Sequence, residues 1–328
     1  MTCSHSPNVH TKHDIYICAT PLHCLIAMRI LETTQANGKL LYFTWSNSDK
    51  DKYYFKKASL KFDEAEYICM SRFMLYNYLR AITKFSLESC RRVYLGSVGG
   101  LFFQYILSII KFEELRTYDD GIGNVFIEGE YFKPQNHSLL KNMLYKAIGG
   151  RYSLEAIKKE SKKHFTIFKG PNAFRNCEYL DIFRNKDAEP VYGDKVIRIF
   201  LGQPREGALT AIDVEQALKQ LFNYLNIDLY LPHPRESQDF LNGLRVDTAE
   251  IAEDYIDSLL KTGHYEKIEV YSFYSTSLLT LSGHESICCT AIRFEGFHTD
   301  SLYELFKENG VKVLNYKELI DSYEHAND

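Results

Sequence analysis

The sequence lacks a long apolar run and an excess of positive charge. Its 328 residues carry 39 lysines and arginines against 43 acidic residues, a formal net charge of −4. Such a chain has no overall positive field to attract nucleic acid. The most apolar segment, residues 94–112, is interrupted by three glycines. That pattern is typical of a strand, a loop and a core helix, and it argues against a membrane span.

The sequence also lacks a metal-binding cysteine pattern. Its eight cysteines include no C-x-x-C pair, which argues against a zinc site and favours buried thiols in a reducing compartment. Residues 1–14 are polar and resemble neither a signal peptide nor an anchor, so we predict a disordered polar tail. We therefore expect a cytoplasmic protein without a metal.

One local cluster of positive charge stands out, the segment "AIKKESKKH" at residues 156–164. Such a run is usually the solvated face of a helix. The alternative is a contact with an anionic glycolipid or with the inner membrane, which would make the protein peripheral to that membrane.

Strands and amphipathic helices alternate in the first half of the chain. An apolar run at 14–20 precedes a helical pattern at 21–34, with Thr20 in the N-cap position and Pro21 in the first turn. Further strand patterns follow, at 39–45, 65–70, 91–97 and 114–121. This alternation predicts a doubly wound α/β domain over residues 15–188.

A second α/β series follows a polar stretch at 184–194, which we interpret as a linker. Strand patterns occur at 195–202, 226–233, 267–275, 285–294 and 311–316, and helical patterns at 211–225 and 250–263. Residues 189–328 therefore form a second predicted domain. The predicted fold class is α/β, with two tandem Rossmann-like domains and a cleft between them.

Four predicted strands end in polar segments. These are "YDDGIGN" (118–124), "LGQPREG" (201–207), "LPHPRE" (231–236) and "YSFYSTS" (271–277). Each segment also has a purely structural interpretation. In the same order, these are an Asp-Gly turn, a solvated loop, a structural histidine and N-capping by Ser275. Because parallel sheets bind ligands at the carboxyl ends of their strands, the four segments together favour a nucleotide-sugar site.

The residue types in these segments suit group transfer from a phosphate. His233 lies between two prolines, which suits an imidazole that binds a phosphate or protonates a leaving group. Hydroxyls and free amides at 271–277 suit an anion. Successive side chains of an extended chain point in opposite directions, so one of Asp119 and Asp120 would face the cleft while the other braces the turn.

These segments, with "FTIFKG" (165–170), "IAEDYI" (251–256) and the opening strand and helix, carry a family resemblance. Their order and approximate spacing resemble the bacterial lipooligosaccharide sialyltransferases of glycosyltransferase family 52. The resemblance implies a GT-B-like fold and inverting, metal-independent transfer of sialic acid from CMP-sialic acid. The implied acceptor is a galactose-terminated glycan of lipooligosaccharide or capsule, and the N-terminal domain would be the acceptor side.

The resemblance also implies roles for individual residues. His233 would contact the CMP phosphate, Glu253 would hold the cytidine part, and Ser275 would donate to the phosphate or the sialyl group. The other implied nucleotide contacts are Gly202, Pro234 and Thr276.

The general base departs from the family pattern. The family has an aspartate directly after the Gly-x-Pro turn, where this chain has Arg205, whose guanidinium stays protonated and cannot act as a base. Three carboxylates could replace it, ranked Glu206, Asp120 and Asp213. The departure keeps two rival functions open, a transferase of the same fold that uses another nucleotide sugar and a non-catalytic nucleotide-sugar-binding protein. The acceptor, the linkage and a homodimeric state also stay open.

Overall fold

The computed structural model describes most of the chain, in two compact units. The described residues are 13–36, 38–70, 83, 85, 89–135, 137–183, 193–203, 211–233, 236, 243–294 and 300–327. The first unit holds residues 1–124, 129–166 and 172–180, and the second holds 125–128, 167–171 and 181–328. The predicted boundary at 188/189 lies outside the described residues. The predicted tail reaches one residue too far, because Asp14 is buried in the first strand.

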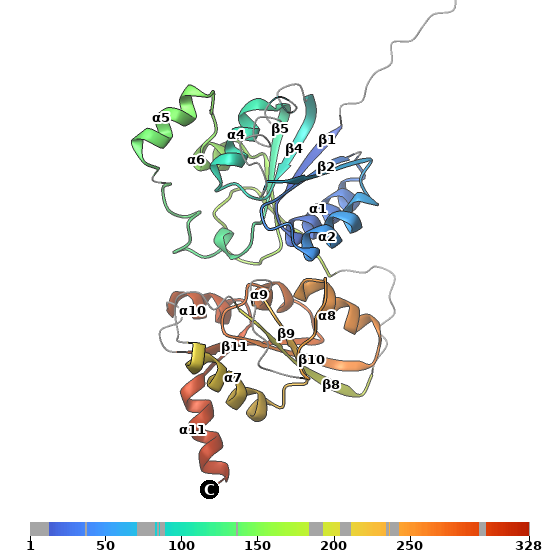
Figure 1. The fold of residues 1–328 in the computed structure, drawn as a ribbon, viewed down its shortest axis with the longest axis vertical. Helices are drawn as coiled ribbons and strands as arrows, with labels where there is room; N and C mark the ends of the chain where they lie inside the picture. Colours follow the sequence, from blue (N-terminus) through green and yellow to red (C-terminus); the bar gives the residue numbers. More distant parts are fainter. Residues whose placement is uncertain are drawn as a thin grey trace, which may run out of the picture. The chain divides into compact units, whose positions relative to one another are not determined.

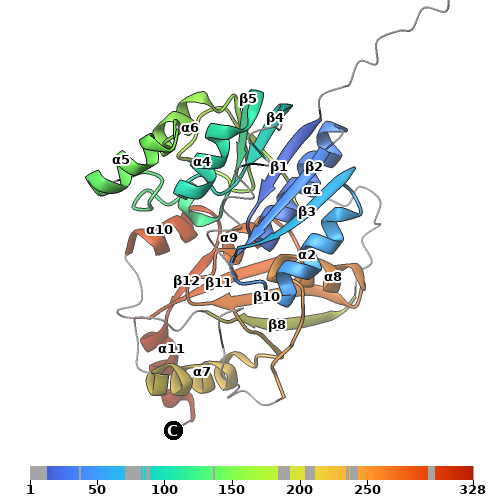
Figure 2. The ribbon, with the colours of Figure 1, turned by 45° about the horizontal axis from the view of Figure 1, so that its top comes forward.

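The first unit contains a seven-stranded parallel sheet. Its strands are β1 (Asp14–Cys18), β2 (Gly38–Thr44), β3 (Glu64–Cys69), β4 (Ser89–Leu95), β5 (Lys111–Tyr118), β6 (Lys163–Thr166) and β7 (Cys177–Tyr179). Their order is β3-β2-β1-β4-β5-β6-β7, as Figure 2 shows for β1 to β5. The chain moves outward from β1 to β3 and then returns to the other side of β1. The topological switch point therefore lies between β1 and β4.

Helices cover both faces of this sheet (Figure 1). The helices are α1 (Pro21–Thr34), α2 (Asp49–Ser59), α4 (Leu101–Ile109), α5 (Leu139–Ala147) and α6 (Leu154–Glu160), with a short 3-10 turn at Ile122–Asn124. Helices α1 and α2 lie on one face, and α4 and α6 lie on the other. The predicted start of α1 is confirmed, since the Thr20 side chain accepts a hydrogen bond from the backbone N–H of His23.

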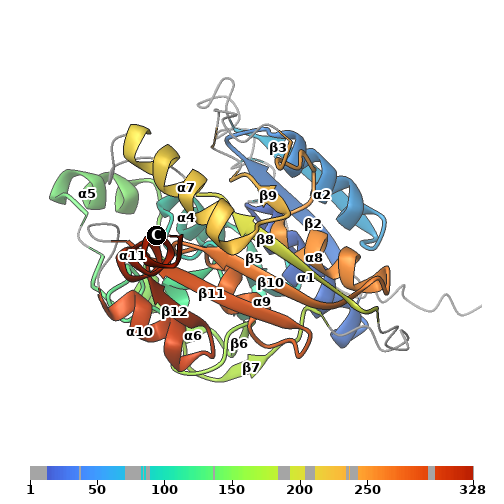
Figure 3. The same cartoon turned by 90° about the horizontal axis from the view of Figure 1, so that it is seen from below.

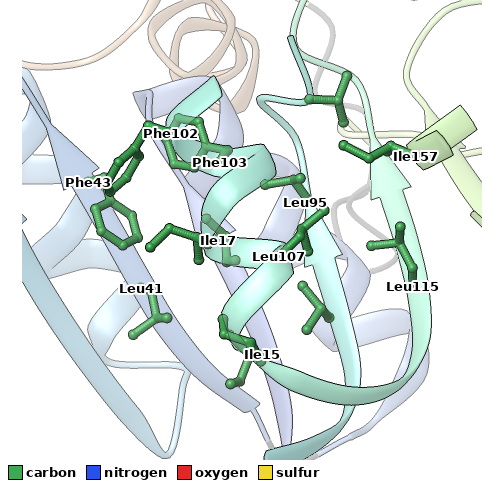
Figure 4. Close-up of a cluster of buried hydrophobic side chains, with 14 of the residues drawn as sticks. Ile15, Ile17, Leu41, Phe43, Leu95, Phe102, Phe103, Leu107, Leu115 and Ile157 are labelled. Carbon is green, nitrogen blue, oxygen red and sulfur yellow. The ribbon is translucent and has the colours of Figure 1, made fainter. Parts of the chain in front are cut away.

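The main core of the first unit lies under α4 (Figure 4). Alternate residues of β1 and β2 point to this face, and they pack against aromatic and aliphatic side chains of α4 and α6. The cluster includes Ile15, Ile17, Leu41, Phe43, Phe102, Phe103, Leu107 and Ile157. Each such side chain contributes about 1.5–3 kcal/mol when fully buried, so this layer fixes the strand ends that carry the polar residues described below.

The second unit contains a five-stranded parallel sheet. Its strands are β8 (Lys195–Leu201), β9 (Leu229–Leu231), β10 (Tyr265–Ser272), β11 (Ile287–Arg293) and β12 (Lys312–Asn315). Their order is β12-β11-β10-β8-β9 (Figure 3). The chain runs from β8 to β9 and then to β10 on the other side of β8. This unit therefore has its switch point between β8 and β10.

The helices of the second unit are α7 (Ala211–Leu225), α8 (Ala252–Lys261), α9 (Ser277–Leu281), α10 (Asp300–Glu308) and α11 (Tyr316–Asn327). Helices α7 and α11 cover one face of the sheet, and α8 and α9 cover the other (Figure 1). Both predicted α/β units are thus confirmed. Strands β6 and β7 were not predicted, because they are short and mix polar with apolar residues.

Candidate functional site

Asp119 and Asp120 follow β5 and point into different surroundings, as the alternation of an extended chain predicted. The Asp119 side chain is fully buried, whereas about a fifth of the Asp120 side chain (21%) is exposed. One carboxylate therefore braces the structure, and the other is open to a ligand.

The Asp119 carboxylate is the centre of a buried network. Its Oδ1 lies 2.8 Å from Nε2 of His164 and accepts a hydrogen bond from Nδ2 of Asn172 (3.2 Å). Its Oδ2 accepts from the hydroxyl of Thr166 at 2.7 Å. The other ring nitrogen of His164 lies 2.8 Å from the Thr117 hydroxyl. These contacts join β5 to β6 and to the segment after β6, which makes Asp119 a structural residue.

The Asp120 carboxylate is held by three side chains. Nε2 of His23 lies 2.6 Å from its Oδ1, while the hydroxyls of Tyr131 (2.5 Å) and Ser97 (3.3 Å) donate to its Oδ2. Burial alone would raise the pKa of Asp120, but the attraction to His23 and the two hydroxyls lowers it below its usual value. Asp120 is therefore ionised at neutral pH.

His23 presents an N–H to Asp120. Its Nδ1 accepts a hydrogen bond from the backbone N–H of Ala19 (3.1 Å), so the ring proton of the neutral imidazole lies on Nε2. The contact between Nε2 and the carboxylate is close but not aligned as a hydrogen bond. The ring therefore stabilises the negative charge mainly by electrostatic attraction.

His23, Ser97 and Asp120 follow three neighbouring strands, two of which, β1 and β4, flank the switch point of the first sheet. His23 lies in the first turn after β1, Ser97 follows β4, and Asp120 follows β5. Our sequence reasoning predicted Asp120 but missed His23, Ser97 and Tyr131. The position of His23, directly after the first strand, is the signal that could have identified it.

In the second unit, Gly202 follows β8 directly, and its Cα lies close to several polar groups. A Cβ atom at this position would lie 2.4 Å from Oε2 of Glu236, 2.6 Å from the Tyr230 hydroxyl and 2.9 Å from the backbone nitrogen of His233. No real Cβ contact is that short, so only glycine fits here.

Glu236 fixes the backbone of His233. The buried Glu236 carboxylate accepts hydrogen bonds from the Tyr230 hydroxyl (2.5 Å) and from the His233 N–H (3.1 Å). The N–H of Glu236 donates in turn to the carbonyl of His233 at 2.9 Å. The backbone of His233 is thus held by the carboxylate of Glu236.

Gln203 connects the ends of β8 and β10, the strands at the second switch point. With its amide oriented to suit its neighbours, its Oε1 accepts from the backbone N–H groups of Phe273 (3.0 Å) and Tyr274 (2.8 Å). The Ser272 hydroxyl donates to the carbonyl of Leu201 at 2.9 Å. These bonds fix the loop that carries the predicted contacts Ser275 and Thr276.

The start of α9 differs from the alternative prediction that Ser275 is the N-cap of a helix. The N-cap of α9 is Thr276 rather than Ser275, and the Thr276 side chain makes no capping bond. The Ser275 hydroxyl accepts from the N–H of Ser277 at 3.3 Å. Both predicted contacts are half-buried, which leaves part of each side chain open to a ligand.

Glu253 lies in the first turn of α8 and is buried. Its Oε1 accepts a hydrogen bond from the Thr280 hydroxyl of α9 at 2.9 Å, and burial raises its pKa. Glu253 therefore ties α8 to α9, and its predicted contact with cytidine stays a prediction.

Several predicted site residues lie outside the described residues. Glu206 and Pro234 are among them, as is the side chain of Asp213. Arg205, which we excluded as a base, also lies outside the described residues. Within the described part of the chain, no cluster of His, Cys, Asp and Glu could hold a metal ion. Among the described helices, none has the length and apolar character needed to cross a membrane.

The lack of space for a side chain at Gly202 can be tested by substitution. We expect Gly202→Ala to weaken nucleotide binding by at least roughly tenfold, because the new methyl group must displace Glu236 and with it the backbone of His233. Titration calorimetry with a nucleotide measures the effect. Gly100→Ala is the matched control, since its nearest contact would be an ordinary 3.4 Å. Unchanged binding in Gly202→Ala would separate Gly202 from the nucleotide site.

Comparison with known proteins shows that the chain matches a family of glycosyltransferases. The model of glycosyltransferase family 52 matches residues 30–295. The chain is 28% identical over 324 residues to the CMP-N-acetylneuraminate:beta-galactoside alpha-2,3-sialyltransferase of Pasteurella multocida (strain Pm70), covering 93% of this chain and 100% of that protein. It is 27% identical to an N-acetyllactosaminide alpha-2,3-sialyltransferase of Haemophilus influenzae (strain ATCC 51907 / DSM 11121 / KW20 / Rd), with the same coverage.

A solved structure supports the fold. The glycotransferase of kitacinnamycin aligns with a TM-score of 0.50 at 8% identity, covering 93% of this chain and 87% of that one. The likeness concerns the fold alone, and it confirms the predicted GT-B-like fold with two Rossmann-like units. The predicted cleft between them stays a prediction.

Proposed function

The chain belongs to glycosyltransferase family 52, and we propose that it moves sialic acid from CMP-sialic acid to a galactose-terminated glycan, forming an α2,3 linkage. The observation that carries this proposal is the match over nearly the whole chain to relatives named alpha-2,3-sialyltransferases. Polar residues at the switch points of both sheets support it, since such positions bind ligands in open α/β sheets.

On the donor side, the second unit would bind CMP-sialic acid. The bond between the sialyl anomeric carbon and the phosphate oxygen breaks, and the departing phosphate gains negative charge. His233 would donate a proton or a hydrogen bond to that oxygen, and the hydroxyls of Ser275 and Thr276 would stabilise the charge. Because these groups can meet the charge of a monophosphate, we propose that no metal is needed. The remaining donor contacts are Gly202, Pro234 and Glu253.

On the acceptor side, an acceptor hydroxyl attacks the opposite face of the anomeric carbon, so the configuration inverts. Its proton must pass to a base. The lowered pKa of Asp120 makes this carboxylate a weak base but a good hydrogen-bond acceptor for a sugar hydroxyl. We therefore assign acceptor binding to Asp120 and keep Glu206 first for the base, ahead of Asp120 and Asp213.

The biological setting is part of the proposal. The acceptor would be a glycan of lipooligosaccharide or capsule. The enzyme would work in the cytoplasm, peripheral to the inner membrane where lipid-linked glycans are assembled. The basic run at 156–164 stays a predicted contact, although Lys158 there pairs with Glu155 at 3.1 Å.

Nucleotide selectivity tests this function. We expect titration calorimetry to show binding of CMP in preference to UDP and GDP, and His233→Ala to weaken CMP binding by roughly 10- to 100-fold, since it removes a hydrogen bond to a charged phosphate. His264→Ala, which removes an exposed histidine of the same unit, is the control. A transfer assay with CMP-sialic acid and lactose completes the test.

Each rival function predicts another result. Preference for UDP would indicate a transferase that uses a different nucleotide sugar. Selective CMP binding without transfer to any galactose-terminated acceptor would indicate a non-catalytic binding protein, the reading that Arg205 at the expected base position keeps open.

A further inference from the structure

Trp45, the only tryptophan of the chain, follows β2 directly and lies partly in solvent. Its side chain is 43% exposed, whereas Phe43, two residues earlier and on the same side of the strand, is fully buried. Because the strands are parallel, the carboxyl end of β2 lies at the same edge of the sheet as the end of β5, which precedes Asp120. Open α/β sheets bind their ligands at this edge.

The indole of Trp45 is held in place by the start of α4. Its ring makes perpendicular contacts with Phe102 (centroids 5.6 Å apart, interplanar angle 89°) and with Phe103 (5.8 Å, 76°). Figure 4 shows these two phenylalanines in α4, beside Phe43 of β2. Neither phenylalanine lies flat against the indole, and the exposed part of the ring is open to a ligand.

A polar network holds the loop that carries Trp45. The buried Asp51 carboxylate of α2 accepts hydrogen bonds from the hydroxyls of Thr44 (2.9 Å) and Ser46 (2.5 Å). The N–H of Asn47 donates to the Thr44 hydroxyl at 2.9 Å. The backbone is therefore fixed on both sides of the indole, so a ligand that binds there has little loop ordering to offset.

We propose that Trp45 is a stacking platform for the sugar residues that precede the terminal galactose of the acceptor. The proposal rests on the proposed function, which puts that galactose at Asp120. The ends of β2 and β5 are three strand spacings apart, roughly 14 Å. An acceptor of two or three sugar residues is long enough to reach both Asp120 and Trp45.

The chemistry of a pyranose ring suits the exposed indole. A sugar with equatorial hydroxyls presents C–H groups on its two faces, and these groups pack against the electron-rich face of an aromatic ring. A residue that only covered the core would gain most by burying its ring, because apolar area left in water is unfavourable. A stacked sugar would remove the exposed indole area from water.

The dependence on acceptor length tests the platform, because only a longer acceptor reaches Trp45. Steady-state kinetics with saturating CMP-sialic acid would compare methyl β-galactoside with a tetrasaccharide that ends in N-acetyllactosamine. We expect Trp45→Ala to lower kcat/KM for the tetrasaccharide roughly 5- to 30-fold, through KM, and to lower kcat/KM for methyl β-galactoside much less. Trp45→Phe, which keeps a flat ring, should give an intermediate loss for the tetrasaccharide.

Tyr53→Ala is the matched control. Tyr53 is 37% exposed and makes a perpendicular ring contact with Tyr54, but it lies within α2 and not at the end of a strand. This variant should leave kcat/KM unchanged for both acceptors.

The fluorescence of the wild-type chain gives a second readout, which does not need transfer. Because Trp45 is the only tryptophan, its emission reports directly on the platform. With CMP present, the tetrasaccharide should shift this emission to shorter wavelength in a saturable way, since the sugar removes the indole from water. Methyl β-galactoside should leave the emission unchanged.

Two outcomes would overturn the platform. One is an equal loss of kcat/KM for both acceptors in Trp45→Ala and in Trp45→Phe, or no loss for either. The other is a wild-type chain that transfers sialic acid to the tetrasaccharide without any shift in emission. A saturable shift in a chain that transfers no sialic acid would instead reject the proposed function and leave the platform intact.

Discussion

Replacing Glu206 with glutamine is expected to lower kcat for sialyl transfer by roughly 10²–10⁴-fold, the usual cost of losing a general base. Asp120→Asn should lower kcat/KM by only roughly 10- to 100-fold, mainly through a higher KM for the acceptor. The two variants are matched, since each removes one negative charge and keeps the shape of the side chain.

The difference follows from the environment of Asp120. Both of its oxygens already have partners, from His23 on one side and from Tyr131 and Ser97 on the other. These partners stabilise the charged form and lower the pKa, which weakens the carboxylate as a proton acceptor. A carboxylate accepts a proton near neutral pH more readily when no such partners lower its pKa. We therefore keep Glu206 as the proposed base.

Steady-state kinetics with CMP-sialic acid and lactose, with each substrate varied in turn, measures both variants. Near-normal turnover in Glu206→Gln would reject this assignment and move the base to Asp120 or Asp213. A collapse of kcat in Asp120→Asn, with no change in the acceptor KM, would decide for Asp120. The pH profile adds a check, because a base with a lowered pKa keeps its activity to lower pH than an ordinary carboxylate does.

The two sheets were predictable because parallel strands buried on both faces are continuous apolar runs between amphipathic helices. Strand β9 shows the limit. The pattern at 226–233 predicts eight residues of strand, but only Leu229–Leu231 pair with β8. On its outer side β9 pairs through an isolated bridge between Tyr230 and Arg245, so the ends of this edge strand are decided by contacts with a loop that a pattern does not encode.

The candidate site was predictable in part for a similar reason. The polar ends of β5, β8, β9 and β10 were visible as segments of sequence, and the structure places Asp120, Gly202, His233 and Ser275 at those ends. Their partners were not visible. His23 meets Asp120 across 97 positions of sequence, and Gln203 meets Phe273 across 70, so only the strand order brings them together.

Replacing Asp119 with alanine is expected to lower the free energy of unfolding of the first unit by about 3–5 kcal/mol, the usual cost of removing one partner of a buried charge network. The substitution would remove an acceptor from the buried Thr166 hydroxyl, from the buried His164 ring and from the Asn172 amide. Urea unfolding followed by the fluorescence of Trp45 measures this loss. Trp45 is the only tryptophan of the chain and packs against Phe102 in the first unit.

Asp120→Asn is the comparison for this measurement, because it changes the neighbouring residue of the same loop. Asparagine keeps a side-chain oxygen that can still accept from the hydroxyls of Tyr131 and Ser97, so the expected loss of stability is only about 1 kcal/mol. The two substitutions should therefore have different effects. Replacing Asp119 should mainly lower the stability, and replacing Asp120 should mainly raise the KM for the acceptor. Equal stability losses in the two variants would contradict this division, since it would mean that both carboxylates serve mainly to hold the strand end together.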